Sequence, residues 1–285
     1  MPVRRPRFTI AATTRRPCRA VIGLTFSLML LTLAACGNGE EKVIADTPPE
    51  TLFNHAMSQL ESGDGGEAIK YFDEVDRQHP YSVWANKAQL MSAFALYSSN
   101  KYEDALSALD RFIQLHPGSR DAPYAYYLKA LCYYERITDV TRDQEITQQA
   151  LKSLQDVVRR FPDSQYARDS QIKIDLTRDH LAGKEMEIGR FYMKRHQYLA
   201  AINRFRNVVE SYQTTDQVPE ALERLTEAYL AIGLTDEAQA AGAVLGHNFP
   251  GSPWYGDAYK LLTNANLEPK ESQTSWLGRV WGSVF

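Results

Sequence analysis

The chain has 285 residues, with 32 lysine and arginine and 35 aspartate and glutamate side chains, for a formal net charge of −3. Six arginines and no acidic residue lie before residue 36, so residues 36–285 carry 26 basic and 35 acidic side chains, a formal charge of −9. Such a charge opposes binding to nucleic acid and favours basic patches on partners. The length is ample for a hydrophobic core.

The N-terminal segment has the layout of an exported precursor. Residues 20–33 contain no charged side chain and follow a basic stretch, which is the order of regions in a signal peptide. The apolar run is shorter than the roughly 20 residues that a spanning helix needs. It ends in Leu33-Ala34-Ala35-Cys36, which predicts removal of residues 1–35 and lipid attachment to Cys36. The alternative is an uncleaved N-terminal anchor in which Cys36 is an ordinary thiol.

The residues after this site predict a flexible tether over 36–49. Residues 37–49 are polar, contain glycine and end in two prolines, and a dozen residues span at most roughly 40 Å when extended. The residue after the lipid site is Gly37 and not an aspartate, which favours sorting of the lipoprotein to the outer membrane. Because Cys18 leaves with the signal and Cys36 carries lipid, Cys132 is the one remaining thiol and no disulfide forms within the mature chain.

A repeat with a fixed internal spacing follows the tether. In each copy an alanine stands twelve residues before a proline, or before Gln213 in the copy that lacks the proline; the alanines are Ala68, Ala105, Ala150, Ala201 and Ala238. Their separations of 37, 45, 51 and 37 residues lie near the 34-residue period of tetratricopeptide (TPR) repeats. Apolar residues follow each alanine at helical spacing. We therefore predict an all-α, TPR-like helical-repeat solenoid of five helix pairs plus a C-terminal capping helix, against the alternative of a generic helical bundle.

Local signals place the turns and divide the repeats. Five residues before four of the alanines stand residues that tolerate a left-handed turn: Gly63, Asn100, His196 and Gly233. A serine two residues after each repeat proline predicts an N-cap for the next helix. We expect repeats 1–3 in residues 50–164, repeats 4–5 with the cap in 165–262, and a Trp-rich tail in 263–285. Residues 166–195 lack proline, which predicts a helix of about 30 residues that bridges two lobes.

The motifs of enzymes and of metal or cofactor sites are missing from the sequence. The six histidines form no spaced metal set with cysteine or carboxylate. No glycine-rich phosphate loop follows a strand, and no nucleophile motif of the Ser/His/Asp or Cys/His kind stands out. Cys132 lies among apolar neighbours and is interpreted as a core residue. We therefore predict a protein that is not an enzyme and uses no cofactor, and that acts through binding surfaces.

Two sets of aromatic residues are candidates for binding. Tyrosines of repeats two and three combine an apolar ring with a polar tip, which suits an extended peptide; the groove candidates are Tyr97, Tyr124 and Tyr127. In the tail, Trp276, Trp281 and Phe285 share one helical stripe. We favour a short helix that docks on a lipid interface or a partner, and the alternative is a cap packed on the last repeat.

The chain resembles the BamD family, also called ComL or YfiO, of lipoproteins in the outer-membrane β-barrel assembly machine. The resemblance covers nearly all of residues 33–262. It rests on the lipid site, the tether, the five repeats and several local phrases, among them Gly63-Asp64 with Glu67-Ala68-Ile69, Asp110-Arg111-Phe112-Ile113, Phe161-Pro162-Asp163-Ser164-Gln165-Tyr166 and Asn203-Arg204. The chain departs from the enteric pattern in a shorter third-repeat loop without an aromatic insert and in the Trp-rich tail.

The resemblance implies a lipid-anchored scaffold on the outer membrane that faces the periplasm. Its C-terminal half would bind a periplasmic POTRA domain of BamA, with Arg204 and the nearby Arg195 as the charged contacts. Smaller lipoproteins of the machine would be further partners, and the N-terminal repeats would receive C-terminal segments of unfolded barrel substrates. Two alternatives are a different periplasmic TPR adaptor of the cell envelope or division machinery, and a lipid-anchored envelope hydrolase.

Overall fold

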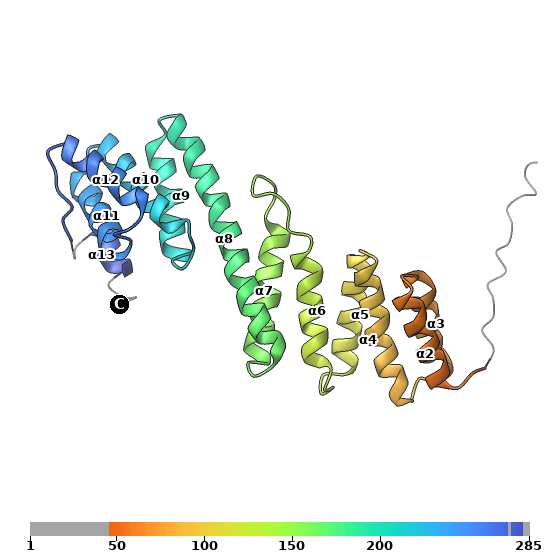
Figure 1. Cartoon of the computed structure of the whole chain (residues 1–285). Helices are drawn as coiled ribbons and strands as arrows, with labels where there is room; N and C mark the ends of the chain where they lie inside the picture. Colours follow the sequence, from red (N-terminus) through yellow and green to blue (C-terminus); the bar gives the residue numbers. More distant parts are fainter. Residues whose placement is uncertain (1–45, 273–274, 282–285) are drawn as a thin grey trace, which may run out of the picture. The chain divides into compact units, whose positions relative to one another are not determined.

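The computed structural model describes residues 46–272 and 275–281 (Figure 1). Every regular element in these ranges is an α-helix. In chain order the helices are α2 (Pro49–Glu61), α3 (Gly65–Gln78), α4 (Val83–Ser98), α5 (Tyr102–Leu115), α6 (Ala122–Tyr134), α7 (Glu145–Arg160), α8 (Gln165–Lys194), α9 (Tyr198–Ser211), α10 (Val218–Ala231), α11 (Thr235–Asn248), α12 (Pro253–Asn264) and α13 (Trp276–Trp281).

From α2 to α12, helices that follow one another in the chain pack side by side (Figure 1). The pairs α2–α3, α4–α5, α6–α7, α8–α9 and α10–α11 correspond to the five repeats, and α12 packs on α10 and α11 at the end of the last pair. Because each helix buries its apolar face against its neighbours along the chain, the core runs along the stack as a series of clusters, each shared by successive pairs. The predicted all-α, TPR-like fold of five pairs with a capping helix is confirmed.

The five repeat alanines occupy the helix crossings. None of them has any exposed surface, and each is the first buried apolar residue on the second helix of its repeat. Four residues later stand fully buried side chains in the first four repeats: Phe72, Leu109, Leu154 and Phe205. In the fifth repeat this position is Gly242, where an added Cβ would lie 2.6 Å from the side chain of Leu262. Gly242 therefore leaves the space that the capping helix α12 needs to pack against α11.

The turns between paired helices follow the sequence signals. Gly63, Asn100, His196 and Gly233 all have positive φ, between 57° and 88°, as the left-handed turn requires. The predicted serine N-caps are confirmed at three sites: Ser82, Ser164 and Ser252 each accept a backbone N–H of the next helix.

The prediction for the serine cap of the second repeat is wrong. The Ser119 hydroxyl accepts the N–H of Asp121 at 3.1 Å, and α6 begins later, at Ala122, with Pro123 in its first turn. Proline is favoured in the first turn because it lacks the N–H that would be unsatisfied there. The start of α6 is therefore displaced beyond the reach of the serine.

The last residues of the predicted tether belong to the folded body. They bond to the first repeat: the N–H of Thr47 donates to Gln78 at 3.1 Å, and the Thr47 carbonyl lies 2.8 Å from the His79 ring. Helix α2 then begins at Pro49. Residues 47–49 are therefore part of the folded body, because these bonds hold them against the end of α3.

Helix α8 spans 30 residues, as predicted, and is about 45 Å long. Ile174 in its first half belongs to the apolar cluster of α6 and α7, whereas Ala182 and Met186 in its second half belong to the cluster of the last repeats. The helix therefore connects repeat three to repeat four through one continuous backbone. The division into two lobes at residues 164 and 165 stays a prediction.

Gly189 on α8 tests how tightly the fourth pair is packed. A Cβ on Gly189 would lie 2.3 Å from Cε1 of Phe205, which is fully buried, whereas a Cβ on Gly183 would meet its nearest neighbour at an ordinary 3.6 Å. We expect Gly189→Ala to lower the unfolding free energy by about 1–3 kcal/mol, because the crossing must widen. Thermal unfolding of the mature chain measures this.

Gly183→Ala is the matched control on the same helix. It should leave stability unchanged or raise it slightly, because alanine favours helix over glycine by about 1 kcal/mol. If both variants melt at the same temperature, the close approach at Gly189 does not limit the packing of α8 on α9.

Candidate partner-binding surfaces

Arg204 lies on α9 and faces α8 across a small polar cavity. Its Nη1 donates to Oε2 of Glu185 on α8 at 3.2 Å. The side chain of Arg204 is 42% exposed, while that of Glu185 is 17% exposed. The cavity has a volume of about 340 Å³, and its lining residues are Glu185, Tyr192, Ala200, Asn203, Arg204 and Asn207. Arg204 is therefore held in place by an internal ion pair and still has guanidinium surface open to solvent.

The chemistry around Arg204 suits an acidic, hydrogen-bonding ligand group. Asn203 and Asn207 lie one helical turn apart on α9, and both line the cavity with amides that donate and accept. Tyr212, at the end of α9, has its pKa raised by burial and also by the negative charge of Glu185, so its hydroxyl is neutral at physiological pH. A guanidinium beside two amides binds a carboxylate together with adjacent peptide groups.

Arg195, the second predicted contact, lies apart from this cavity. It follows the last residue of α8, ten residues after Glu185, which is a distance of about 15 Å along a helix. Its guanidinium carbon lies 4.3 Å from the ring centre of Phe191. Phe191 and Leu199 are both exposed. The structure therefore does not bring Arg195 and Arg204 into one site, and Arg195 belongs to a separate cation–aromatic surface at the α8–α9 turn.

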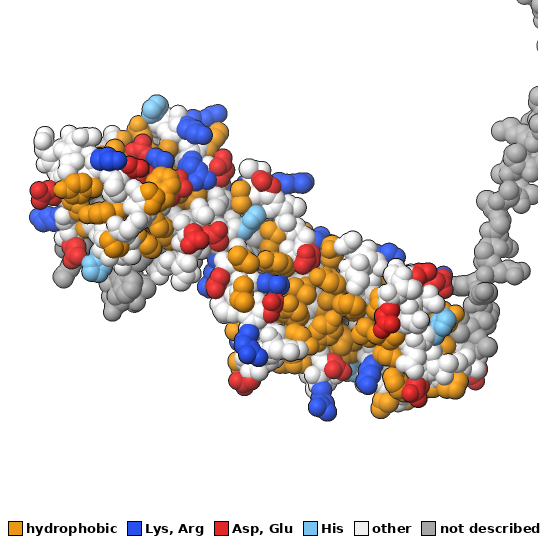
Figure 2. Space-filling view, viewed as in Figure 1, with side chains coloured by type: hydrophobic (Ala, Val, Ile, Leu, Met, Phe, Trp, Pro, Cys, Tyr) orange, Lys and Arg blue, Asp and Glu red, His pale blue; other side chains and the backbone are white. Residues whose placement is uncertain are grey.

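The three candidate groove tyrosines lie on two neighbouring helices and are half-buried. Tyr97 is on α4, and Tyr124 and Tyr127 are on α6. Both α6 tyrosines contact the ring of Tyr166 on α8, with ring centres 5.5 and 5.2 Å apart. In Figure 2, hydrophobic side chains gather over α4 and α6. The structure thus brings the α6 tyrosines together around Tyr166, which the sequence analysis had not selected.

The hydroxyl groups of this tyrosine surface are neutral hydrogen-bonding groups. Burial raises the pKa of Tyr97 and of Tyr124 to about 12. Burial also raises the pKa of Tyr127, whose hydroxyl donates to Oδ2 of Asp169 on α8 at 2.5 Å. Half-exposed rings with uncharged hydroxyls offer apolar area and hydrogen bonds to a chain that lies across them.

The described part of the Trp-rich tail packs on the last repeats. Leu277 in α13 is fully buried, and the helix contacts α11. The ring centre of Trp276 lies 4.1 Å from the guanidinium carbon of Arg206, and its Nε1 donates to Glu210 at 2.5 Å. For Trp276 the structure therefore shows the cap that was the alternative, and not a free anchor. Docking through Trp281 and Phe285 stays a prediction, since the side chain of Trp281 and all of Phe285 lie outside the described residues.

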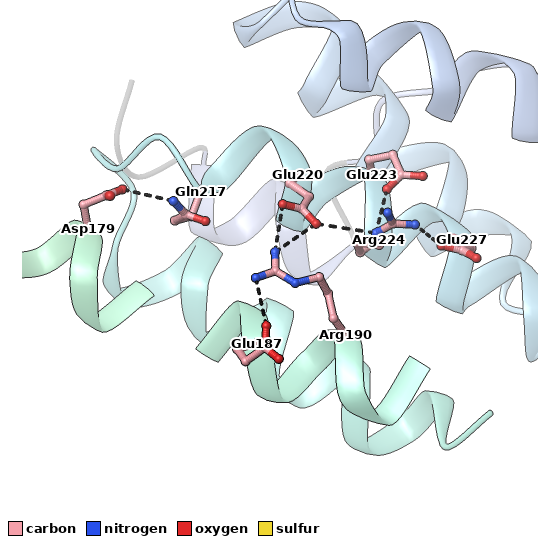
Figure 3. Close-up of polar contacts among 8 residues, drawn as sticks. All are labelled: Asp179, Glu187, Arg190, Gln217, Glu220, Glu223, Arg224 and Glu227. Atoms are coloured by element: carbon pink, nitrogen blue, oxygen red, sulfur yellow. Dashed lines mark hydrogen bonds and ion pairs between the residues drawn. The ribbon is translucent and has the colours of Figure 1, made fainter. Parts of the chain in front are cut away.

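A charged network that the sequence analysis missed joins α8 to α10 (Figure 3). Nη1 of Arg190 on α8 donates to both carboxylate oxygens of Glu220 on α10, at 3.0 and 3.1 Å. One turn further along α10, Arg224 pairs with Glu227 at 2.8 Å and with Glu223 at 3.3 Å. The spacing of charges on α10 was visible in the sequence. Their partner Arg190 was not, because it is 30 residues away.

Glu223 is the most deeply buried acidic group of this network, at 4% exposed. Burial raises its pKa to about 7, and neighbouring acidic residues add to this effect, whereas Arg224 opposes it. The folded chain therefore binds a proton on Glu223 more tightly than the unfolded chain, in which the pKa has its ordinary value near 4.5. The stability from this group is complete below pH 4.5 and is lost as the pH rises through 7.

We expect Glu223→Gln to remove this loss of folding stability at higher pH. The variant should be more stable than the parent chain at pH 8, by about 1–3 kcal/mol, and should show a flatter profile between pH 5 and pH 8. Urea unfolding at several pH values measures it. Glu227→Gln removes a charge from the same helix and leaves the buried carboxylate in place, so its profile should still fall. A parent profile that rises from pH 5 to pH 8 would contradict the assignment.

The remaining site predictions concern cysteine, metal and membrane. Cys132 is buried, and burial raises the pKa of its thiol to about 12, so it is no nucleophile. Within residues 46–272 and 275–281, no group of three histidine, cysteine or acidic side chains is placed to hold a metal ion. None of the described helices has the length and hydropathy needed to span a bilayer. Cys36, the predicted lipid site, lies outside the described residues.

Comparison with known proteins identifies relatives along most of the chain. The model of the YfiO family, described as an outer membrane lipoprotein, matches residues 45–245. The outer membrane protein assembly factor BamD of Caulobacter vibrioides is 50% identical over 254 residues, which cover 88% of this chain and 83% of the relative. The corresponding protein of Rickettsia prowazekii is 45% identical over 234 residues, covering 82% of this chain and 93% of the relative.

Solved structures with a similar fold are more distant. A TPR protein of Thermus thermophilus is 18% identical, with a TM-score of 0.36, over 76% of this chain and all of that chain. The TPR2AB domain of yeast Sti1 is 11% identical, with a TM-score of 0.41, over 76% of this chain and 84% of that chain. The family match and the two relatives, by contrast, cover the tyrosine surface, the Arg204 cavity and the charged network alike. The chain therefore belongs to the BamD family of outer membrane lipoproteins, which are outer membrane protein assembly factors.

Proposed function

We propose that this chain is a non-enzymatic scaffold of the β-barrel assembly machine, anchored to the outer membrane and binding the POTRA domain of BamA through α8 and α9. The family match over residues 45–245 supports the assembly role. The observation that carries the partner assignment is the half-exposed guanidinium of Arg204 in a polar cavity between two rigidly packed helices.

The internal partner of Arg204 explains how the cavity stays ordered before a partner binds. Glu185 satisfies one edge of the guanidinium at 3.2 Å and is itself largely covered. A carboxylate of BamA binds the open edge of Arg204, and the amides of Asn203 and Asn207 bind the peptide groups beside it. Because Arg204 is held in position beforehand, little side-chain entropy is lost on binding.

The N-terminal repeats supply a second surface for a different ligand. The half-buried tyrosines of α4 and α6 provide apolar area with neutral hydroxyls, which suits the C-terminal segment of an unfolded barrel substrate. Asp169 fixes the hydroxyl of Tyr127 and so orients that ring. Substrate and BamA then occupy separate repeats, and the other lipoproteins of the machine contact the remaining surface.

Reversal of the charge at position 204 tests the BamA assignment. We expect Arg204→Glu to weaken binding of the BamA POTRA domain by a few kcal/mol, because a partner carboxylate then faces two negative charges, the introduced carboxylate and that of Glu185. Isothermal titration measures the affinity, and circular dichroism checks that the helices persist.

Two further variants make this test specific. Arg168→Glu makes the same change of net charge at an exposed position near the start of α8, 17 residues before Glu185, and should leave the affinity unchanged. Glu185→Gln removes the internal negative charge but keeps an amide oxygen that can accept the hydrogen bond of Arg204, so it should not weaken binding. If Arg204→Glu binds as the parent chain does, or unfolds, the assignment of Arg204 is wrong.

Lipid attachment is tested at Cys36. We expect Cys36→Ala to leave unprocessed or mislocalised protein, because this thiol is the acceptor in the predicted site. Mass spectrometry of the mature N-terminus should find an acylated cysteine at position 36 in the parent chain. Cys132→Ala should be processed normally, since Cys132 is buried in the apolar cluster formed by α4, α5 and α6. Cleavage elsewhere with an unmodified Cys36 would refute the proposed anchor.

A further inference from the structure

The turn between α3 and α4 carries two exposed apolar side chains next to the point where the tether meets the folded body. Tyr81 is 100% exposed and Val83 is 77% exposed, which are the two highest values among the large apolar residues of the described chain. The turn follows directly on Gln78 and His79, the residues that hold Thr47. The first folded residues after the tether therefore lie beside this turn.

The repeats themselves provide an internal comparison for this turn. The same Pro-x-Ser-x sequence occurs in four turns, three between successive repeats and one between the fifth repeat and the capping helix α12. The residues that flank the serine are Tyr81 and Val83, Gly118 and Arg120, Asp163 and Gln165, and Gly251 and Pro253. A large apolar pair thus occurs only in the turn next to the tether. The geometry of the turn does not need it, because Ser82 supplies the cap by accepting the N–H of Ala85.

The surroundings of the turn suit an anionic phospholipid surface. Lys87 lies one helical turn after Val83 on α4 and is exposed, with its ammonium 5.2 Å from the ring of Trp84. Arg120, the residue of the α5–α6 turn that corresponds to Val83, is also exposed. Tyrosine is enriched at the headgroup level of membranes because its ring is apolar and its tip is polar. Basic side chains nearby add attraction to anionic headgroups.

The tether makes such a contact effectively intramolecular. Asp46 is the tenth residue after Cys36, so the lipid site lies at most roughly 35 Å along the chain from the folded body. A weak surface contact within this reach is strengthened by the anchor, because the local concentration of membrane is high. The acidic residues Asp121 and Asp163 in the second and third turns oppose a wider contact, which restricts it to the first turn.

We infer that the α3–α4 turn, through Tyr81 and Val83, contacts the anionic phospholipid bilayer that carries the lipid anchor. This inference rests on the proposed anchor at Cys36. The contact orients the end of the first repeat that carries the Pro-x-Ser-x turn toward the membrane. The α3–α4, α5–α6 and α7–α8 turns lie along the same edge (Figure 1), so the contact also sets the direction in which the later repeats extend.

A depth measurement with the mature, lipidated chain tests the inference. A nitroxide is attached to Asn86→Cys, an exposed position on α4 that leaves Tyr81 and Val83 intact. The control is Arg168→Cys, which is also exposed and stands the same four residues after the capping serine of its turn. Cys132 is buried and does not take the label. The chain is bound to vesicles of phosphatidylethanolamine and phosphatidylglycerol, and power saturation compares access of oxygen with access of a water-soluble nickel chelate.

We expect the label at position 86 to become shielded from nickel and accessible to oxygen by several-fold on vesicle binding, whereas the label at 168 stays water-exposed. The double variant Y81D/V83Q copies the residues of the third turn, so it should melt as the parent chain does and still float with vesicles, but lose the shielding at position 86. A water-exposed label at 86 on floating protein would refute the membrane contact while leaving the anchor intact, and would favour a protein partner on this turn. Failure to float would refute the anchor, and the contact with it.

Discussion

The whole stack depends on the close approach of paired helices at the five repeat alanines. Each alanine is fully buried, as expected where a methyl group stands between two packed helices. Gly189 of α8 lies against Phe205 of α9 within the fourth pair, and Gly242 of α11 lies against Leu262 of the capping helix α12; neither site has room for a Cβ. Because interiors are packed to crystal-like density, such a crossing has one preferred geometry. A stack of these pairs is therefore stiff enough to position side chains on its surface.

This stiffness explains why the candidate surfaces are built from half-buried groups. Arg204 and Tyr127 each have one side fixed by a partner on α8, namely Glu185 and Asp169, and the other side open to solvent. Helix α8 thus supplies the inner partner for both surfaces, one from each of its halves. Its continuous backbone fixes the spacing between them, while the network around Arg190 ties its second half to α10. A scaffold that binds two ligands at once needs such a fixed spacing.

The sequence predicted the features that arise from local or periodic signals. The alanine spacing predicted the five pairs, and the glycine, asparagine and histidine turns were placed correctly because positive φ is a local requirement. The ion pair between Arg204 and Glu185 and the bond from Trp276 to Glu210 were missed, because they join residues 19 and 66 positions apart. The third-repeat loop was recognised from the sequence as short and without an aromatic insert. Its anchoring by Lys184, which donates to the Thr141 carbonyl at 2.8 Å, depends on how α8 passes the loop.

Hydrogen exchange of the mature chain, alone and bound to the BamA POTRA domain, tests most directly whether this is a rigid scaffold with separate surfaces. The account predicts added protection confined to α8 and α9 around the Arg204 cavity, with exchange in the first two repeats unchanged. A substrate C-terminal peptide should instead protect α4 and α6. Protection or loosening that spreads through all five repeats when BamA binds would contradict the account, because the stack would then rearrange as a unit.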